Sequence, residues 1–309
     1  MKILLTGASG LVGGAFARAA ARRGHYVVGT TLSYKEAIDG LAEHRSLNLT
    51  DAPALTSVVL DIFPDVIVNA AAISEPAGCE ANPALAQAVN VALPELLARL
   101  AFHVSARFIH LSSEQVFDGN HPPYRPTDPT APITLYGRQK LASEQVVHRV
   151  APEFAVTLRA PLLGGNSPSG RRSLHERLFA DWMSGRTPQL YTDEIRQVCH
   201  ADNLAEVMVE LCERPDVRGV HHWAGSEGLS RHELGERIRS HFKLTPAQAP
   251  LIAITRTADP AVARRRQADL RLVLEPLAGR LKTRPENFST QLDQLVIPAP
   301  CRAWYQSLS

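Results

Sequence analysis

Short apolar runs alternate with longer segments of helical character along the first half of the chain. The run 2–6 is apolar, and the segment LVGGAFARAAARR that follows at 11–23 is rich in strong helix formers. The same alternation repeats several times, and it is typical of a parallel sheet wound on both faces by helices. The predicted strands are 2–6, 25–31, 65–71, 107–113 and 154–160, and the predicted helices are 11–23, 53–62 and 83–103. We therefore predict an α/β fold with a doubly wound parallel sheet.

The second half of the chain has a less regular pattern. A proline-rich loop, HPPYRPTDPTAP at 121–132, precedes a helix that contains Tyr136 and Lys140. Further helices are predicted at 173–184, 202–213 and 230–242. We expect a dinucleotide-binding domain over 1–160, with 192–216 returning to it, and a smaller substrate-binding part made of 161–191 and 217–309.

A glycine pattern stands between the first strand and the first helix. Gly7, Gly10 and Gly13 are spaced as Gly-x-x-Gly-x-x-Gly in TGASGLVG. Glycines at this position allow a tight turn and let backbone amides approach a pyrophosphate at a helix N-terminus. The position of the pattern predicts a Rossmann-type fold that binds a dinucleotide.

The end of the second strand bears on which dinucleotide is bound. An Asp or Glu usually stands there when the ribose 2′-hydroxyl is recognised, whereas this chain reads Gly-Thr-Thr-Leu-Ser at 29–33. Thr30, Thr31, Ser33 and Lys35 offer hydroxyl donors and one positive charge to a 2′-phosphate. We predict that NADP(H) is preferred and that NAD(H) is possible.

Tyr136 and Lys140 are four residues apart, which places them on one face of a helix. An adjacent ammonium group stabilises a phenolate, so this pairing favours proton donation from the tyrosine to a carbonyl that is being reduced. Ser113 ends the preceding strand, where its hydroxyl can hydrogen-bond a substrate oxygen. The three residues predict a reductase site.

The chain resembles the extended short-chain dehydrogenase/reductase family through TGASGLVG (6–13), NAAA (69–72), SSEQVFDG (112–119) and YGRQK (136–140). Within that family it is most similar to dTDP-4-dehydrorhamnose reductase-like proteins, through VFDG, PYRPTDPTAPITLYGRQKLASE (123–144) and LRAPLLGG (158–165). The resemblance implies a nicotinamide-dependent enzyme that acts on a nucleotide-linked sugar.

The resemblance also implies roles for individual residues. The catalytic residues it implies are Ser113, Tyr136, Lys140 and Asn90. Together with the glycine loop and the end of the second strand, it gives the expected cofactor-binding residues, which are Gly7, Ser9, Gly10, Leu11, Val12, Gly13, Thr30, Thr31, Ser33, Asn48, Leu49, Ala70, Ala71, Ala72, Tyr136 and Lys140. Substrate contacts are expected from Ser113, Glu114, Gln115 and Tyr136.

Asn90 matches a helix residue whose backbone carbonyl, in the family, holds a water in a proton relay towards the lysine. Pro94 stands four residues later and lacks the N–H that would bond to this carbonyl in a continuous helix. We therefore expect the Asn90 carbonyl to need another partner, and the relay water is our hypothesis for it. The alternative is a kink that serves packing alone.

The family commonly reads Ser-Thr-Asp-Tyr before Val-Phe-Asp-Gly, whereas this chain has Ser112, Ser113, Glu114 and Gln115. The catalytic hydroxyl is kept, but the neighbouring pocket contacts differ. We expect an NAD(P)H-dependent reductase of a nucleotide-linked keto sugar. The alternatives are a nucleotide-sugar epimerase or dehydratase, and a cofactor-binding regulatory subunit like that of methionine adenosyltransferase.

Composition limits the possible partners. The 33 Lys+Arg and 31 Asp+Glu residues nearly balance, so no overall charge points to nucleic acid or to an anionic membrane. The four cysteines and twelve histidines show no metal-ligand spacing, so no metal is expected. No uninterrupted apolar run reaches about 20 residues. We expect a cytoplasmic protein, with a homodimer possible.

Two arginine clusters remain. The pair Arg171-Arg172 could contact a substrate phosphate, because an arginine fork matches phosphate oxygens. For the run 264–266 we expect solvated surface.

Overall fold

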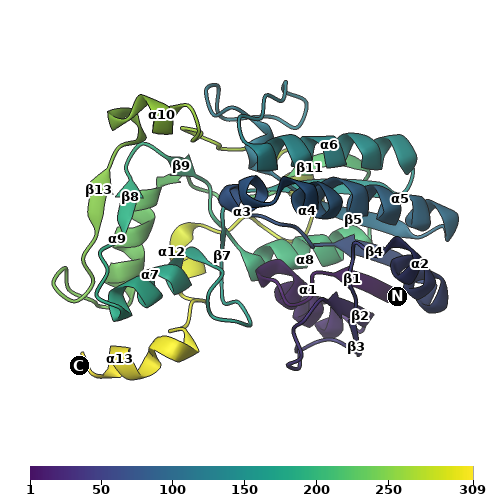
Figure 1. The fold of residues 1–309 in the computed structure, drawn as a ribbon, viewed down its shortest axis with the longest axis horizontal. Helices are drawn as coiled ribbons and strands as arrows, with labels where there is room; N and C mark the ends of the chain where they lie inside the picture. Colours follow the sequence, from purple (N-terminus) through teal and green to yellow (C-terminus); the bar gives the residue numbers. More distant parts are fainter. Residues whose placement is uncertain (309) are drawn as a thin grey trace.

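The computed structural model describes residues 1–308 and contains a seven-stranded, all-parallel sheet (Figure 1). Its strand order is β11-β6-β5-β4-β1-β2-β3. The strands are β1 (Lys2–Thr6), β2 (Tyr26–Thr31), β3 (Glu43–Ser46), β4 (Val66–Asn69), β5 (Arg107–Ser113), β6 (Ala155–Ala160) and β11 (Gly219–His222). The predicted fold class is confirmed.

Helices cover both faces of this sheet, because alternate strand residues point to opposite sides. On β1, Ile3 and Leu5 belong to a core shared with α1 and α8, whereas Leu4 belongs to a core shared with α2 and α5. In Figure 1, α5 and α6 lie in the upper part of the large lobe, and α1 and α8 lie lower. The bounds are α1 (Leu11–Arg22), α2 (Ala52–Ile62), α5 (Leu93–His103), α6 (Leu135–Val150) and α8 (Ala201–Cys212).

The helix predicted over 83–103 is continuous but changes its winding. It consists of α4 (Pro83–Gln87), the π-helical turn η1 (Ala88–Ala92) and α5. This helix is long and apolar enough to cross a bilayer, but core helices of soluble proteins pass the same test. Half of its most apolar 18-residue window is buried inside the protein. Leu97 and Ala98 are completely buried against the sheet. Two short elements lie beside the sheet edge, α3 (Pro76–Ala81) and η2 (Glu114–Val116).

A second lobe with its own core occupies the left of Figure 1. Phe179 packs edge-to-face on Phe242, with the ring centroids 4.9 Å apart. The elements of this lobe and its connections are β7 (Leu163–Gly164), α7 (Leu174–Met183), β8 (Gln189–Tyr191), β9 (Ile195–Arg196), β10 (Cys199–His200), β12 (Leu229–Ser230), α9 (Arg231–His241), β13 (Ile252–Ile254), η3 (Arg256–Ala258), α10 (Pro260–Ala263), α12 (Phe288–Leu292), η4 (Ala299–Cys301) and α13 (Arg302–Gln306).

Segments of the chain beyond residue 216 still belong to the large sheet and its core, which the sequence pattern did not indicate. We expected the chain to leave the sheet at 216, but β11 follows at 219–222 and pairs with β6. Later still, α11 (Leu277–Arg280) contributes Leu277 and Ala278 to the core beneath the sheet. Both segments are too short to show a helical or alternating pattern, so their placement depends on tertiary contacts.

Candidate active site

The glycine loop is built by close approach of backbone to backbone. Gly7 has a φ of +74°, and a Cβ there would lie 2.8 Å from the Cα of Ala71. A Cβ at Gly13 would lie 2.1 Å from the carbonyl oxygen of Gly7. Neither position can accept a side chain, so the loop at the end of β1 rests directly on the segment of Ala70–Ala72 that follows β4.

The N-terminus of α1 opens at this loop. Within the described residues no side chain caps the helix at Gly10, and its first turn has no acidic residue. A Cβ at Gly10 would meet only the Gly7 carbonyl oxygen, at 3.1 Å. Uncapped N–H groups and the helix dipole favour an anion at this position. Gly10, Leu11 and Val12, with Ser9 beside them, therefore fit a dinucleotide pyrophosphate.

The end of β2 differs from the expectation for two residues. Both hydroxyls that we expected to be offered to a 2′-phosphate are buried and bonded within the protein. Thr30 Oγ1 donates to the Leu5 carbonyl at 3.4 Å, and Thr31 Oγ1 lies 2.7 Å from His44 Nε2. Strand packing has turned these side chains inwards. Ser33 and Lys35 are exposed beyond them and keep their polar groups available.

Asn48 and Leu49 follow β3 in the next loop along this edge of the sheet. Asn48 Oδ1 accepts hydrogen bonds from the Thr50 N–H at 3.1 Å and from the Thr50 hydroxyl at 2.9 Å. Leu49 packs partly against the core above the sheet. Because the carboxyl ends of parallel strands share one edge, this loop lies on the same edge as Ser33.

The catalytic residues expected from the sequence come together at the carboxyl end of β5. Ser113 is the last residue of β5, and Tyr136 and Lys140 occupy the first turns of α6. The Lys140 Nζ lies 5.9 Å from the centroid of the Tyr136 ring and donates to the Leu111 carbonyl at 2.9 Å. Tyr136 and Ser113 share a side-chain hydrogen bond. All three side chains are buried.

Local sequence explains how α6 approaches so closely. Thr134 caps the helix by accepting from the Gly137 N–H at 3.0 Å. A Cβ at residue 137 would lie 2.2 Å from the Gln115 carbonyl oxygen, so only glycine lets the helix pack onto η2. The glycine after Tyr136 therefore sets the distance between Tyr136 and the end of β5.

Burial dominates the electrostatics of this site. It raises the pKa of the Tyr136 phenol far above its ordinary value, although the hydrogen bond to Ser113 lowers it. We expected an adjacent ammonium to lower this pKa, but the Lys140 amine is held on the Leu111 carbonyl instead. Burial also lowers the pKa of Lys140 to about 8, against the opposing effect of Glu144.

Asn90 lies at the centre of the π-helical turn and is completely buried. Its side-chain Nδ2 donates to Gln139 Oε1 at 2.9 Å and to the Ile73 carbonyl at 3.1 Å, while its Oδ1 accepts from the Ile73 N–H at 2.9 Å. The side chain thus joins the loop after β4 to α6, a role that the sequence did not indicate. Pro94 withholds the α-helical bond from the Asn90 carbonyl, and the relay water stays a prediction.

The two residues after Ser113 point to different neighbours. Glu114 is buried, and its Oε1 lies 3.4 Å from Arg196 Nε in the second lobe. Its Oε2 has no hydrogen-bond partner within residues 1–308, and burial raises its pKa to about 7. Gln115 is half-buried and accepts from the Thr134 hydroxyl at 3.3 Å. Glu114 therefore joins the two lobes beside the Ser113 hydroxyl.

An arginine cluster extends from this contact and was missed by sequence reasoning. Arg196, Arg231 and Arg266 surround Glu194, which is 1% exposed. Arg266 pairs with Glu194, with Nη2 3.1 Å from Oε2, so our expectation of solvated surface holds only in part for this residue, whose side chain is 40% exposed. The run itself was the only available signal, because Glu194 lies 72 positions earlier in the chain.

Arg231 is the least neutralised member of this cluster. Its Nε lies 3.8 Å from Glu194 Oε2, which is too far for a hydrogen bond. Burial lowers the pKa of its guanidinium to about 10, and the neighbouring Arg196, Arg177 and Arg266 lower it further, against Glu194. Three arginines facing the Glu194 carboxylate form a cluster of basic side chains that reaches Glu114, the residue after Ser113.

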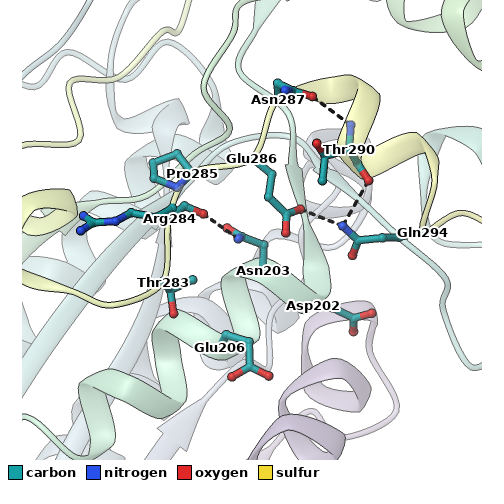
Figure 2. A pocket seen from close by; sticks show the side chains of 10 residues that line it. All are labelled: Asp202, Asn203, Glu206, Thr283, Arg284, Pro285, Glu286, Asn287, Thr290 and Gln294. Carbon is teal, nitrogen blue, oxygen red and sulfur yellow. Dashed lines mark hydrogen bonds between the residues drawn. The ribbon is translucent and has the colours of Figure 1, made fainter.

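A separate pocket of about 450 Å³ lies at the start of α8 (Figure 2). Its walls are the 283–287 segment, the first turn of α8 and the side chains of Thr290 and Gln294. Figure 2 shows Asp202, Glu206 and Glu286 around it, with Gln294 Nε2 donating to Glu286 Oε2 at 2.9 Å. None of the site residues predicted from the sequence lines this pocket, so it lies apart from the predicted site.

Comparison with known proteins gives one family over nearly the whole chain. The RmlD substrate binding domain matches residues 1–299. Methionine adenosyltransferase 2 subunit beta of Xenopus laevis is 33% identical over 248 residues, which are 79% of this chain and 72% of that protein. The dTDP-4-dehydrorhamnose reductase of Mycobacterium tuberculosis (strain CDC 1551 / Oshkosh) is 34% identical over 246 residues, 78% of this chain and 72% of that protein.

A solved structure agrees with the fold. The crystal structure of a hypothetical dTDP-4-dehydrorhamnose reductase from Sulfolobus tokodaii superposes with a TM-score of 0.80. It shares 26% sequence identity and covers 96% of this chain and 100% of its own. The likeness therefore includes both the large sheet and the second lobe.

Proposed function

The chain belongs to the RmlD substrate binding domain family, and from that premise we propose that it is an NAD(P)H-dependent reductase of a nucleotide-linked keto sugar. The observation that carries the proposal is the meeting of Ser113, Tyr136 and Lys140 at the end of β5, beside a glycine loop that fits a dinucleotide. These residues have the chemistry that carbonyl reduction requires.

The mechanism follows from the positions of these groups. The reduced nicotinamide, when bound, supplies a hydride to the keto carbon. As the carbonyl π electrons move to oxygen, Tyr136 gives its phenolic proton to that oxygen and the C–O group becomes an alcohol. Ser113 hydrogen-bonds the same oxygen and orients it. Lys140 in its ammonium form, with Nζ 5.9 Å from the centroid of the Tyr136 ring, supplies a positive charge near the phenolate that remains, and the buried site screens this charge poorly.

The arginine cluster supports the nucleotide part of the substrate. Arg231 has no hydrogen-bonded carboxylate within residues 1–308, although it is surrounded by other arginines. A diphosphate is the group that such a cluster binds best, because its oxygens match the guanidinium fork and neutralise the excess charge. Glu114, one residue from Ser113, would then meet the sugar hydroxyls.

NADP(H) is our proposal for the preferred cofactor. The hydroxyls of Thr30 and Thr31 are hydrogen-bonded within the protein, so Ser33 and Lys35 are the exposed polar residues that can contact a cofactor at the end of β2. Replacing Lys35 by alanine should weaken NADPH binding about 3- to 10-fold and leave NADH binding unchanged, since only NADPH carries the 2′-phosphate. Fluorescence titration measures both. Tenfold tighter binding of NADH than of NADPH by the unaltered protein would refute the preference.

NADPH oxidation followed by absorbance, with a panel of dTDP-, GDP- and UDP-linked 4-keto sugars, tests the activity. The Tyr136→Phe protein serves as the negative control, and Tyr305→Phe, whose hydroxyl donates to the Phe242 carbonyl in the second lobe, is the matched control. We expect turnover that Tyr136→Phe lowers by at least about 1000-fold and Tyr305→Phe does not. Sugar conversion without net NADPH consumption would indicate an epimerase or dehydratase instead.

A regulatory subunit is the second candidate, because one relative at 33% identity is named methionine adenosyltransferase 2 subunit beta. The complete set of Ser113, Tyr136 and Lys140 favours the enzyme. Tight NADPH binding, no turnover of any sugar, and a stable complex with a methionine adenosyltransferase catalytic subunit in light scattering would together favour the regulatory function.

A further inference from the structure

Five buried polar groups form an unbroken chain across the sheet, from the strand before the glycine loop to the catalytic helix. Thr6 Oγ1 donates to Asn69 Oδ1 at 2.7 Å, and Asn69 Nδ2 lies 3.2 Å from His110 Nδ1. His110 Nε2 lies 2.9 Å from Ser143 Oγ, which donates to the Lys140 carbonyl at 2.7 Å. Every residue of the chain is at most 2% exposed. The path therefore has no access to solvent.

The donors and acceptors determine the protonation of His110. Asn69 Oδ1 accepts from Thr6 and also from the Ala71 N–H at 3.3 Å, so the Asn69 amide NH₂ faces the imidazole. His110 Nδ1 must then be an acceptor and its proton must lie on Nε2, pointing at Ser143. Because the Ser143 proton is already directed at the Lys140 carbonyl, all bonds run in one direction.

Only neutral His110 completes this chain. An imidazolium would set its Nδ1–H against the Asn69 NH₂, with two donors facing each other. Burial lowers the pKa of His110 well below its ordinary value, and the charged groups that face it, Lys140 and His148 on α6, lower it further. Phe108 stacks at 6.0 Å between centroids on the same strand. The surroundings thus favour the neutral His110 tautomer with its proton on Nε2, which is the one that the hydrogen bonds require.

The chain ends at the residue whose position matters most for proton donation. Lys140 is attached to β5 twice: its Nζ donates to the Leu111 carbonyl, and its own carbonyl is held through Ser143 by His110, the neighbour of Leu111. Tyr136 lies one turn before Lys140 on the same helix. Sliding or rotation of α6 on β5 would move both side chains, and about 1 Å of displacement can reduce a rate about 100-fold.

We propose that His110 is a positioning residue that fixes α6, and with it Lys140 and Tyr136, against the strand preceding the glycine loop. The proposal rests on the proposed reductase function for its kinetic consequences. Ser143→Ala removes the link with little change in volume. We expect kcat to fall about 10-fold or more and the Kd for NADPH to rise by a clearly smaller factor, because Lys140 and Tyr136 are displaced while Thr6 and Asn69 below the glycine loop remain bonded.

The matched control is Thr157→Val. Thr157 is completely buried, and its Oγ1 lies 2.9 Å from Nε2 of the partly buried His148, so it joins the same helix to β6 through another histidine–hydroxyl bond, eight residues beyond Lys140. It should destabilise the protein about as much as Ser143→Ala and leave kcat within twofold. Equal losses of kcat in the two variants would show that the loss comes from general destabilisation of the protein, and this result would overturn the proposal.

Two replacements of His110 sharpen the test. His110→Gln places an amide donor near the position of Nε2 and within reach of Ser143, whereas His110→Asn reaches only the position of Nδ1. We expect the glutamine variant to keep most of the kcat and the asparagine variant to resemble Ser143→Ala. The opposite order would contradict transmission through Ser143.

A readout without substrate separates this proposal from the proposed function. Nitrogen-15 NMR should find His110 protonated on Nε2 and unprotonated on Nδ1 from pH 6 to 8. It should also find the pKa of Lys140 moved towards its ordinary value in Ser143→Ala but not in Thr157→Val, because a displaced helix admits water. If no keto sugar is reduced, the proposed function fails and this measurement still decides: a proton on Nδ1, or an unchanged Lys140 pKa, overturns the positioning role.

Discussion

The carboxylate of Glu114 lies 3.4 Å from the guanidinium of Arg196, across the boundary between the large sheet and the second lobe. Glu114 follows Ser113 directly, so this contact ties the second lobe to the carboxyl end of β5, where Ser113, Tyr136 and Lys140 meet. Because Glu114 Oε2 is buried without a partner within residues 1–308, the carboxylate is only partly stabilised by the arginine.

The first prediction concerns stability at different pH values. Burial raises the pKa of Glu114 to about 7, so the folded protein keeps the group neutral up to that pH, whereas the unfolded chain ionises it near its ordinary value. This contribution to stability is complete below pH 4 and is lost as the pH rises through 7. Glu114→Gln stays neutral, and it should be about 2–3 kcal/mol more stable than the unaltered protein at pH 8.

Urea unfolding of both proteins at pH 5 and pH 8 measures this effect. At pH 5 the two free energies of unfolding should differ by less than about 1 kcal/mol, because both side chains are then neutral when folded. A difference that is the same at both pH values would show that Glu114 is ionised throughout the range.

The second prediction concerns the pH dependence of turnover. Since burial lowers the pKa of Lys140 to about 8, the ammonium form is lost above that pH, while the raised pKa of Tyr136 keeps the phenol protonated. We expect kcat to fall about tenfold per pH unit above 8. The Lys140→Arg protein should have a lower kcat, but its kcat should not fall above pH 8, because arginine stays charged. A flat profile to pH 9.5 in the unaltered protein would contradict the role of Lys140.

The third prediction concerns substrate binding by Arg231. Arg231→Ala should raise the KM for a nucleotide-linked sugar about 10- to 100-fold, the loss expected for a charged hydrogen bond, with no change in the Kd for NADPH. Arg237→Ala is the matched control on the same helix, since Arg237 pairs with Glu227 at 3.3 Å on an exposed face. Steady-state kinetics of both variants measure the KM. An equal rise in KM in Arg231→Ala and Arg237→Ala would show that the effect is not specific to Arg231.

The fourth prediction compares adjacent glycines in α1. Gly13→Ala should destabilise the protein by more than about 3 kcal/mol and abolish cofactor binding, because its Cβ would lie 2.1 Å from the Gly7 carbonyl. At Gly14 the Cβ would meet the Pro168 ring at 3.1 Å, and a small ring movement can relieve this contact. Gly14→Ala should therefore stay within about 1 kcal/mol, helped by the helix propensity of alanine. Thermal unfolding with and without NADPH measures both.

Much of the fold and the catalytic set could be read from local patterns. The alternation of apolar and helical segments predicted strands 2–6 and 107–113 with the bounds that the structure has. The spacing of Tyr136 and Lys140 placed them on one helix face, because residues four apart always share a face. Such relationships span a few residues, so they do not depend on what packs around them.

The environment of those residues was decided only by the tertiary structure. The hydroxyls of Thr30 and Thr31 turned inwards because the neighbouring strands supplied partners, and burial rather than Lys140 set the direction of the Tyr136 pKa. The sequence determined which chemical groups stand at the ends of which strands. Tertiary contacts between residues far apart, as between Glu114 and Arg196, decided which groups are charged, buried or available, because desolvation and pairing depend on every element that packs against a side chain.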